Sequence, residues 1–303
     1  MKRQSKPAAS LKLKPLGQGF AADASGVDLR KPLTPVVVRA IEKAMDRYAV
    51  LVFRDQPLNE DEQIALALSF GPLNGGLRKA TGAPTRFKYD ELIDISNVAA
   101  DGKVVARDDP RLVGTIANQL WHSDSSFQAA PIAYSMLSAV AIPAEGGETE
   151  FADLRAAYDA LPGKTKREIA GLVARHSAFH SRLLLGDDRY TSEQLKVFPK
   201  VDWPLVRVHP GSRRKVLFVG VHCTEILGMT VPEGRMFLAD LIEHATQREF
   251  VHRHEWRSGD LVMWDNRCTL HRGRRYDLSQ RRPRCSVQRL SHITRSPDRH
   301  SCR

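Results

Sequence analysis

The sequence predicts one domain over residues 1–303, built mainly of β-strands with added helices and arranged as a jelly roll. Short β-branched or alternating segments recur along the chain, which is typical of strands. Most helical segments lie outside the main set of strands, and few strands alternate with helices. This order argues against a doubly wound parallel sheet and favours the jelly roll.

Local sequence signals predict where the helices and strands lie. Thr34 followed by Pro35 is typical of a helix start, and Asn59 to Glu62 resembles a capping box. The expected helices lie at residues 36–48, 59–69, 153–161, 164–173 and 233–244. The expected strands lie at residues 50–53, 93–97, 132–142, 205–208, 216–219, 250–256, 261–264 and near 284–290. Residues 70–88, rich in Gly, Pro and Thr, predict a long loop.

The net charge of +11 is concentrated at the two ends of the chain. Residues 1–15 carry five basic side chains and no acid, and residues 272–303 carry ten arginines and two aspartates, so the stretch between them is near neutral. A nucleic-acid surface needs basic residues spread over a folded face. We therefore expect no nucleic-acid partner, a basic tail over 1–11 and an atypical basic tail over 287–303.

Membrane and disulfide signals are both missing from the sequence. No run of 18 apolar residues is present, and the basic start leads into no apolar segment, so we expect neither a membrane span nor a signal peptide. The cysteines form no CxxC pair and are predicted to be free thiols in a reducing cytoplasm. They are Cys223, Cys268, Cys285 and Cys302.

His122 and Asp124 form a possible half of a metal site in the segment WHSDS. In a strand, residues two apart point to one face, so an imidazole and a carboxylate can be aimed at one point. A second histidine would complete a facial triad, which leaves three positions open on an octahedral iron. By itself an HxD pair is a weak signal.

Candidates for the third ligand differ in their surroundings. His252 and His254 alternate with charged residues and predict an exposed strand face. His271 differs because it follows the strand 261–264 and a polar turn, and precedes an arginine cluster. The histidines interpreted as structural are His176, His180, His209, His222 and His244.

The arginine cluster after His271 consists of Arg281, Arg282 and Arg284. A dicarboxylic 2-oxo acid can chelate iron at one end, and its far carboxylate then needs a planar, doubly hydrogen-bonding cation. A solvated basic turn is the ordinary alternative for such a run. On these residues alone both interpretations stay open.

Several motifs together resemble the taurine dioxygenase family of Fe(II)/2-oxoglutarate-dependent dioxygenases, and this resemblance implies a double-stranded β-helix, a jelly roll like that of clavaminate synthase. The resemblance covers about residues 12 to 282, and its closest branch acts on 2,4-dichlorophenoxyacetate. The motifs are WHSDSSFQ at 121–128, GGETEF at 146–151, DLRAAY at 153–158, WDNR at 264–267 and HRGRRY at 271–276.

The resemblance implies a role for individual residues. It makes His122, Asp124 and His271 the iron ligands. Thr149, 27 residues after His122, and Arg282, 11 residues after His271, match the pair that binds the distal carboxylate of 2-oxoglutarate. The resemblance also implies that Asn118 and Trp256 line the pocket.

Two departures from the family concern the substrate. The loop after Phe70-Gly71 lacks the histidine and tyrosine of the taurine branch, which leaves Lys79 as a basic candidate. Ser286 stands where the family has an arginine for the substrate anion. Pro283 is unfavourable in an inner strand. If that strand forms, Arg284 faces the same side as Arg282, so we expect Arg284 and Lys79 to hold the substrate.

The implied reaction is hydroxylation of the carbon next to the ether oxygen of an aryloxyacetate, a small aromatic anion. The products are a phenol, glyoxylate, succinate and CO₂, with O₂ as a second co-substrate and ascorbate as an optional stimulant. A homo-oligomer is compatible with the sequence. The alternatives are a related oxygenase for another carboxylate or a sulfonate, a zinc hydrolase, and a non-enzymatic basic binding protein.

Overall fold

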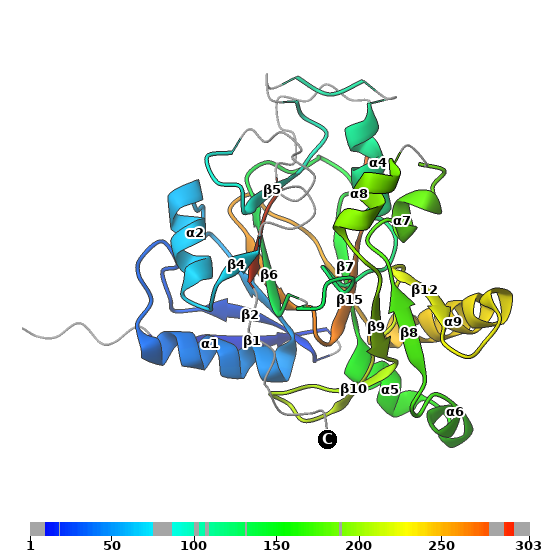
Figure 1. Cartoon of the computed structure of the whole chain (residues 1–303). Coiled ribbons are helices and arrows are strands. Elements are labelled where there is room, and N and C mark those ends of the chain that lie inside the picture. Colours follow the sequence, from blue (N-terminus) through cyan, green and yellow to red (C-terminus); the bar gives the residue numbers. More distant parts are fainter. Residues whose placement is uncertain are drawn as a thin grey trace, which may run out of the picture.

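The computed structural model describes residues 10–17, 19–74, 87–99, 103–106, 109–130, 132–187, 190–278 and 288–293, and Figure 1 shows their arrangement. Three residues that the sequence assigned to co-substrate or substrate lie outside the described residues, and so does the position where the family has an arginine for the substrate anion. The three are Lys79, Arg282 and Arg284, and the fourth position is Ser286.

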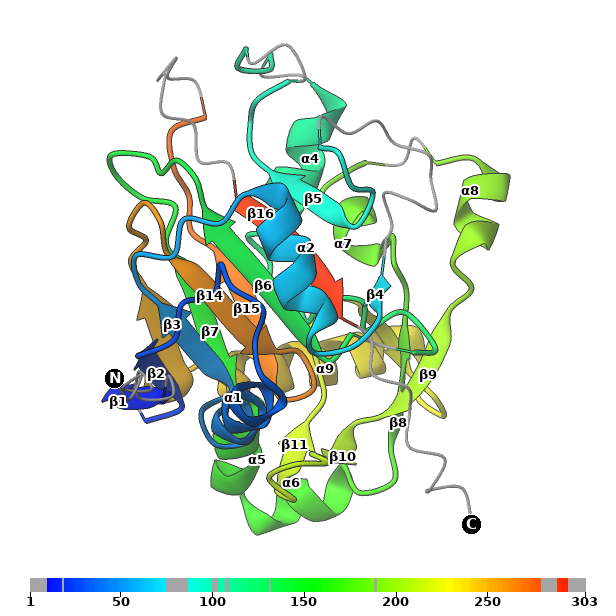
Figure 2. The ribbon, with the colours of Figure 1, turned by 90° about the vertical axis from the view of Figure 1, so that its left-hand side faces the viewer.

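A large mixed sheet forms one side of the protein (Figure 2). In spatial order it runs through β1 (Lys12–Leu16), β2 (Ala21–Ser25), β3 (Val50–Phe53), β14 (Leu261–Asp265), β6 (Tyr134–Ala139), β16 (Gln288–Ile293) and β4 (Leu73–Asn74), and β5 (Leu92–Ile95) also pairs with β16. All of its described pairings are antiparallel except that of β2 with β3.

Two amphipathic helices cover the outer face of the large sheet. The side chain of Thr34 caps α1 (Pro35–Tyr48) by accepting from the backbone of Val37. Asn59 and Glu62 form a reciprocal capping box at the start of α2 (Glu60–Leu68). Both helices are confirmed. Their apolar faces pack on the sheet through residues such as Ile41, Met45, Leu66, Leu51, Phe53 and Met263.

Three smaller sheets lie on the other side of the large one. The first, called the small sheet here, is β13 (Val251–His254), β7 (Thr149–Asp153) and β15 (Thr269–Gly273) in spatial order. The others are β12 (Cys223–Ile226), β8 (Val173–His176) and β9 (Val201–Pro204), and the pair β10 (Val206–Val208) and β11 (Lys215–Leu217).

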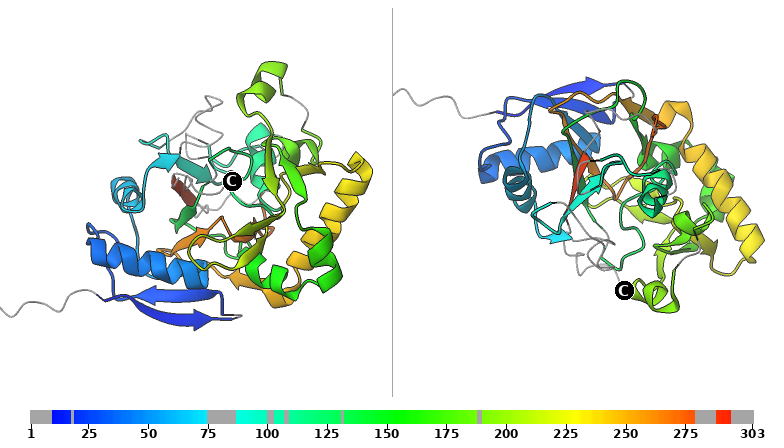
Figure 3. Two further views of the ribbon diagram at one scale, coloured as in Figure 1. Left: turned by 60° about the horizontal axis from the view of Figure 1, so that its bottom comes forward. Right: turned by 90° about the horizontal axis from the view of Figure 1, so that it is seen from above.

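Further helices surround the smaller sheets. They are α4 (Pro110–Ala117), α5 (Leu154–Ala160), α6 (Gly163–Glu168), α7 (His180–Leu183), α8 (Ser192–Val197), α9 (Val231–Ala245) and the 3₁₀ turn η1 (Arg248–Phe250). In both views of Figure 3, α9 lies on the side of the molecule away from α1. α5 and α9 share one apolar cluster with the outer face of the small sheet, through Leu154, Leu238, Leu241, Ala152 and Leu270.

The inner faces of the large and small sheets meet in a separate apolar cluster. Val52, Val262 and Trp264 of the large sheet share this cluster with Phe151 of the small sheet, and the Trp264 and Phe151 rings lie 5.6 Å apart between centroids. His271 lies beside it, because its ring packs against Trp264 at 4.8 Å between centroids. The space between the two sheets is therefore where the candidate metal residues converge.

One predicted helix boundary was wrong, and the last predicted strand is described only in part. The helix expected over 164–173 ends at Glu168, since Gly171 has a φ of +84° and β8 begins at Val173. The last described strand covers Gln288–Ile293, which overlaps the strand expected near 284–290, and the rest of that expected segment lies outside the described residues.

The predicted free thiols are confirmed for Cys223 and Cys268, which are buried and form no disulfide. Within the described residues, no helix combines the length and the apolar character that crossing a membrane requires.

Candidate metal centre

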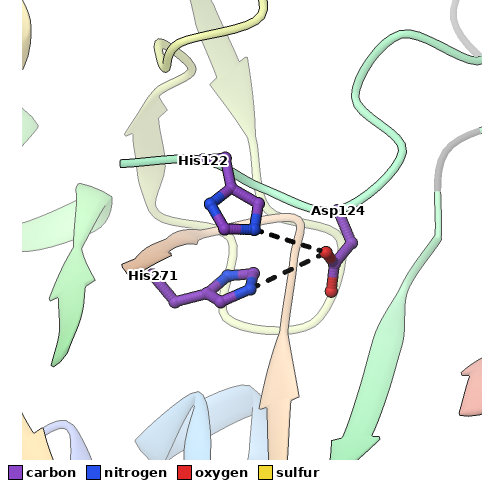
Figure 4. Close-up of side chains that lie close together, drawn as sticks. All are labelled: His122, Asp124 and His271. Carbon is purple, nitrogen blue, oxygen red and sulfur yellow. Dashed lines mark ion pairs between the residues drawn. The ribbon is translucent and has the colours of Figure 1, made fainter. Parts of the chain in front are cut away.

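His122, Asp124 and His271 meet at one point, as Figure 4 shows. Nε2 of each histidine lies 3.7 Å from Oδ1 of Asp124. That separation is too long for a hydrogen bond. The three donor atoms nevertheless all lie within 4.8 Å of one another, and both histidines are buried. Two imidazoles and one carboxylate in this arrangement form a donor set suited to a divalent cation.

The backbone brings the two histidines together. His122 and His271 form an antiparallel bridge, with N to O distances of 3.0 and 2.8 Å in the two directions. The expectation that a strand aligns His122 with Asp124 was wrong. Asp124 lies in a turn that follows the bridge, and Ser125 within that turn has a φ of +53°. The turn, and not strand periodicity, directs the carboxylate to the histidines.

A hydrogen bond fixes the tautomer of His122. Its Nδ1 lies 2.7 Å from the carbonyl oxygen of Leu120. A carbonyl can only accept, so Nδ1 carries a proton, and in the neutral ring that binds a metal the lone pair is then on Nε2, the atom that faces Asp124. An orienting bond of this kind is typical of metal-binding histidines. The residues present therefore fit a divalent cation.

A second group of candidate ligands has a different explanation. His209, Asp265 and Cys268 also lie within metal-binding distance of one another. However, Asp265 accepts from His209 at 3.0 Å and pairs with the guanidinium of Arg267. Burial raises the pKa of the Cys268 thiol well above its usual range. We interpret this group as a structural network that uses its own ion pair.

Thr149 and Asn118 lie near the triad. Thr149 is buried on β7, two residues before Phe151, which pairs with His271 across the small sheet. Its hydroxyl oxygen accepts from Nε1 of Trp256 at 3.0 Å. The carbonyl of Asn118 accepts from the backbone of Gly273, two residues after His271. The structure thus groups these predicted residues around one site.

The other histidines partly correct the sequence interpretation. His254 is buried, not exposed, and lies 3.3 Å from a carboxylate oxygen of Asp260. Hydrogen-bond partners confirm a structural interpretation for His176, with Ser126, and for His244 and His209.

The sequence missed the position of His222. This buried ring packs edge-on at 6.2 Å from His122 and 4.9 Å from Phe127, between centroids. Burial is the main reason that its pKa lies well below the usual range, so it faces the triad as a neutral ring. No local pattern marks this position, because its neighbours Val221 and Cys223 are ordinary apolar residues.

A family model for the taurine catabolism dioxygenase TauD, TfdA family matches residues 12–290. The chain belongs to this family. A similar protein from Cupriavidus pinatubonensis is the alpha-ketoglutarate-dependent 2,4-dichlorophenoxyacetate dioxygenase, 60% identical over 88% of this chain and 93% of its own. A protein of the same name from a Burkholderia strain is 57% identical over 87% of this chain and 89% of its own.

Solved structures of relatives agree with this membership. AAD-2 in complex with Mn(II) and N-oxalylglycine has a TM-score of 0.85 and 47% identity, over 94% of this chain and 97% of the other. A taurine dioxygenase from Burkholderia xenovorans has a TM-score of 0.74 and 28% identity, over 94% and 91% of the two chains. A member of this dioxygenase family is neither the zinc hydrolase nor the non-enzymatic binding protein that the sequence left open.

Proposed function

We propose that the chain is an Fe(II)- and 2-oxoglutarate-dependent dioxygenase that hydroxylates the carbon next to the ether oxygen of an aryloxyacetate such as 2,4-dichlorophenoxyacetate. The hemiacetal product breaks down to a phenol and glyoxylate, and the co-substrates yield succinate and CO₂. The observation that carries this proposal is the convergence of His122, Asp124 and His271 in a chain 60% identical to a dioxygenase of that name.

In this proposal the triad holds the iron through two neutral imidazoles and one carboxylate. Three protein donors leave three positions for 2-oxoglutarate and O₂. When bound, iron with these co-substrates supplies the oxidising power. The chain itself orients the reactants and excludes water from the space between the two sheets.

Thr149 is suited to bind the far carboxylate of 2-oxoglutarate. An indole N–H can only donate, so the Thr149 oxygen accepts from Trp256 and its hydroxyl hydrogen remains available to a carboxylate. Arg282 is the proposed bidentate partner on the other side of that carboxylate. Arg282→Lys keeps the charge and loses the planar fork, so we expect a higher KM for 2-oxoglutarate.

The proposed substrate position lies beside His122. Phe127 makes edge-on ring contacts with Phe198 and His222. A group of aromatic side chains of this kind is suited to pack against the aromatic ring of the substrate. Asn118 directly follows α4, and its carbonyl accepts a hydrogen bond from the backbone of Gly273. We assign the substrate carboxylate to Arg284 with help from Lys79.

The proposal also covers the fold, the cofactors and the cellular location. We infer that the large and small sheets are the two halves of a double-stranded β-helix. We further infer that Fe(II) is the native metal, that ascorbate stimulates turnover by keeping it reduced, and that the protein works in the cytoplasm.

A substrate panel tests the proposal. Succinate and phenol release would be measured with Fe(II), 2-oxoglutarate and O₂ across aryloxyacetates, aryloxypropionates, cinnamates and sulfonates. We expect the highest kcat/KM on aryloxyacetates, with one succinate formed for each phenol. Phenol release that does not depend on 2-oxoglutarate would contradict the reaction class, and a preference for sulfonates would contradict the substrate class.

A further inference from the structure

Asp124, Asn266 and Ser135 form a closed ring of hydrogen bonds that includes the carboxylate of Asp124. The backbone N–H of Asp124 donates to Oδ1 of Asn266 at 3.1 Å. Nδ2 of Asn266 donates to Oγ of Ser135 at 2.8 Å, and Ser135 donates to Oδ2 of Asp124 at 2.7 Å. The ring joins the turn after His122 to β6 and to the end of β14. It therefore ties one candidate ligand to the large sheet.

The direction of every bond in this ring is determined by its chemistry. Oδ1 of Asn266 also faces the indole N–H of Trp264 at 3.1 Å. The Asp124 backbone N–H and the Trp264 indole can only donate, so the Asn266 atom between them must be its oxygen. The amide group of Asn266 must then face Ser135. Because the Ser135 oxygen accepts there, its single hydrogen is left for Asp124.

The two oxygens of Asp124 are consequently different. Oδ2 is engaged by Ser135, whereas Oδ1 lies 3.7 Å from Nε2 of both His122 and His271. Ser135 is completely buried and Asn266 is 2% exposed, so water does not compete for these bonds. The carboxylate is held with one particular oxygen toward the histidines before any ion binds.

We propose that Ser135 and Asn266 are positioning residues that make Asp124 a one-oxygen ligand, an inference that rests on the metal site proposed above. Carboxylates can bind metals through one oxygen or through both. A six-coordinate ion with three protein atoms and two 2-oxoglutarate atoms has one position left for O₂. A second oxygen from Asp124 would occupy it. Engaging Oδ2 elsewhere keeps that position open and fixes the orientation of Oδ1.

The test is binding of Mn(II) alone to the purified full-length protein, measured by calorimetry without O₂ or substrate. Ser135→Ala removes the donor to Oδ2 and is expected to weaken Mn(II) binding roughly 10- to 100-fold, the range for losing a group that orients a ligand. Asn266→Asp replaces the donor to Ser135 with an acceptor, and we expect a loss of similar size. Circular dichroism of each metal-free variant establishes that it is folded.

Two matched variants separate positioning from packing. Ser138→Ala removes another buried serine hydroxyl from β6, one without a hydrogen-bond partner in the described structure, and Mn(II) affinity should stay within about twofold. Ser135→Thr keeps a hydroxyl donor and should retain most of the affinity. Equal affinity in Ser135→Ala and the unchanged protein would overturn the positioning role. Equal losses in Ser135→Ala and Ser135→Thr would assign the effect to packing and also overturn it.

The outcome for the unchanged protein tests the underlying site separately. One Mn(II) bound per chain is expected. If the unchanged protein binds no Mn(II), the metal site itself is refuted, and the positioning role fails with it. If it binds Mn(II) and Ser135→Ala binds equally well, only the positioning role is refuted.

Discussion

Thr149 offers the most specific prediction at the scale of a single residue. Thr149→Val keeps the shape of the side chain and removes the hydroxyl proposed to bind the far carboxylate of 2-oxoglutarate. A hydrogen bond to a charged group contributes about 1.5–3 kcal/mol. We therefore expect the KM for 2-oxoglutarate to rise roughly ten- to a hundredfold. Steady-state kinetics with 2-oxoglutarate varied at saturating substrate would measure it.

Thr224→Val is the matched control for this substitution. Thr224 is also a buried threonine on a strand, and its hydroxyl already donates to the carbonyl of Arg175. This variant should lose stability without a change in the KM for 2-oxoglutarate. An unchanged KM in Thr149→Val, or an equal rise in both variants, would remove Thr149 from the co-substrate site.

Some residues of the site could be predicted from the sequence and others could not. The HxD spacing of His122 and Asp124 and the context of His271 were visible in the sequence, and the structure brings these three together. Ser135 left no signal, because a serine in a buried strand has no distinctive context. Asn266 lay within a recognised motif, but its partner Ser135 is 131 residues away in the sequence. Such a pairing exists only after β6 and β14 become neighbours.

At the scale of elements, the capping box of α2 gives a direct test. Asn59 and Glu62 exchange hydrogen bonds of 2.9 Å between side chain and backbone. Asn59→Ala should lower the free energy of unfolding by about 1 kcal/mol. Asn59→Ser preserves an N-cap acceptor and should lower it by less. Urea titrations of the three proteins would measure this order, and equal stabilities for Asn59→Ala and Asn59→Ser would refute it.

Helix starts could be predicted because the caps are local. Thr34 and Asn59 both bond backbone groups three residues ahead, so the signal lies within one turn. By contrast, the strands β7 and β15 were not expected. β7 is buried between two neighbouring strands and reads Thr-Glu-Phe-Ala-Asp, which lacks a clear alternation of apolar and polar residues. Its identity as a strand depends on the pairing with β13 and β15, which local sequence does not reveal.

For the whole molecule, buried neutral histidines predict loss of stability in acid. Burial lowers the pKa of His176 to about 4 and that of His252 to about 4, and it also lowers the pKa of His254. The unfolded chain takes up these protons near pH 6.5. The free energy of unfolding should therefore fall as the pH drops from 6.5 toward 4, and these groups should have no effect above that window.

His176 is expected to contribute most clearly to this loss of stability in acid, because it is 1% exposed. Its lowered pKa corresponds to about 3 kcal/mol between pH 6.5 and 4. His176→Gln should flatten the pH dependence in this window. Chemical denaturation of the metal-free protein at several pH values would measure the slope. A slope that His176→Gln leaves unchanged would show that other groups control acid stability.

We infer that His122, Asp124 and His271 together hold the metal ion on which turnover depends. Its most direct test is to measure bound iron and 2-oxoglutarate consumption in His271→Ala, with His244→Gln as the control. His244 lies on α9 and contacts only the carbonyl of Ala157 among the hydrogen-bond partners described. We expect His244→Gln to bind one Fe(II) per chain and to consume 2-oxoglutarate at close to the unchanged rate. His271→Ala should remain folded, lose its iron and fall more than about 100-fold in 2-oxoglutarate consumption, because losing a ligand exceeds the usual effect of losing a supporting residue. Near-normal consumption by His271→Ala with iron still bound would show that His271 is not a ligand of the catalytic metal.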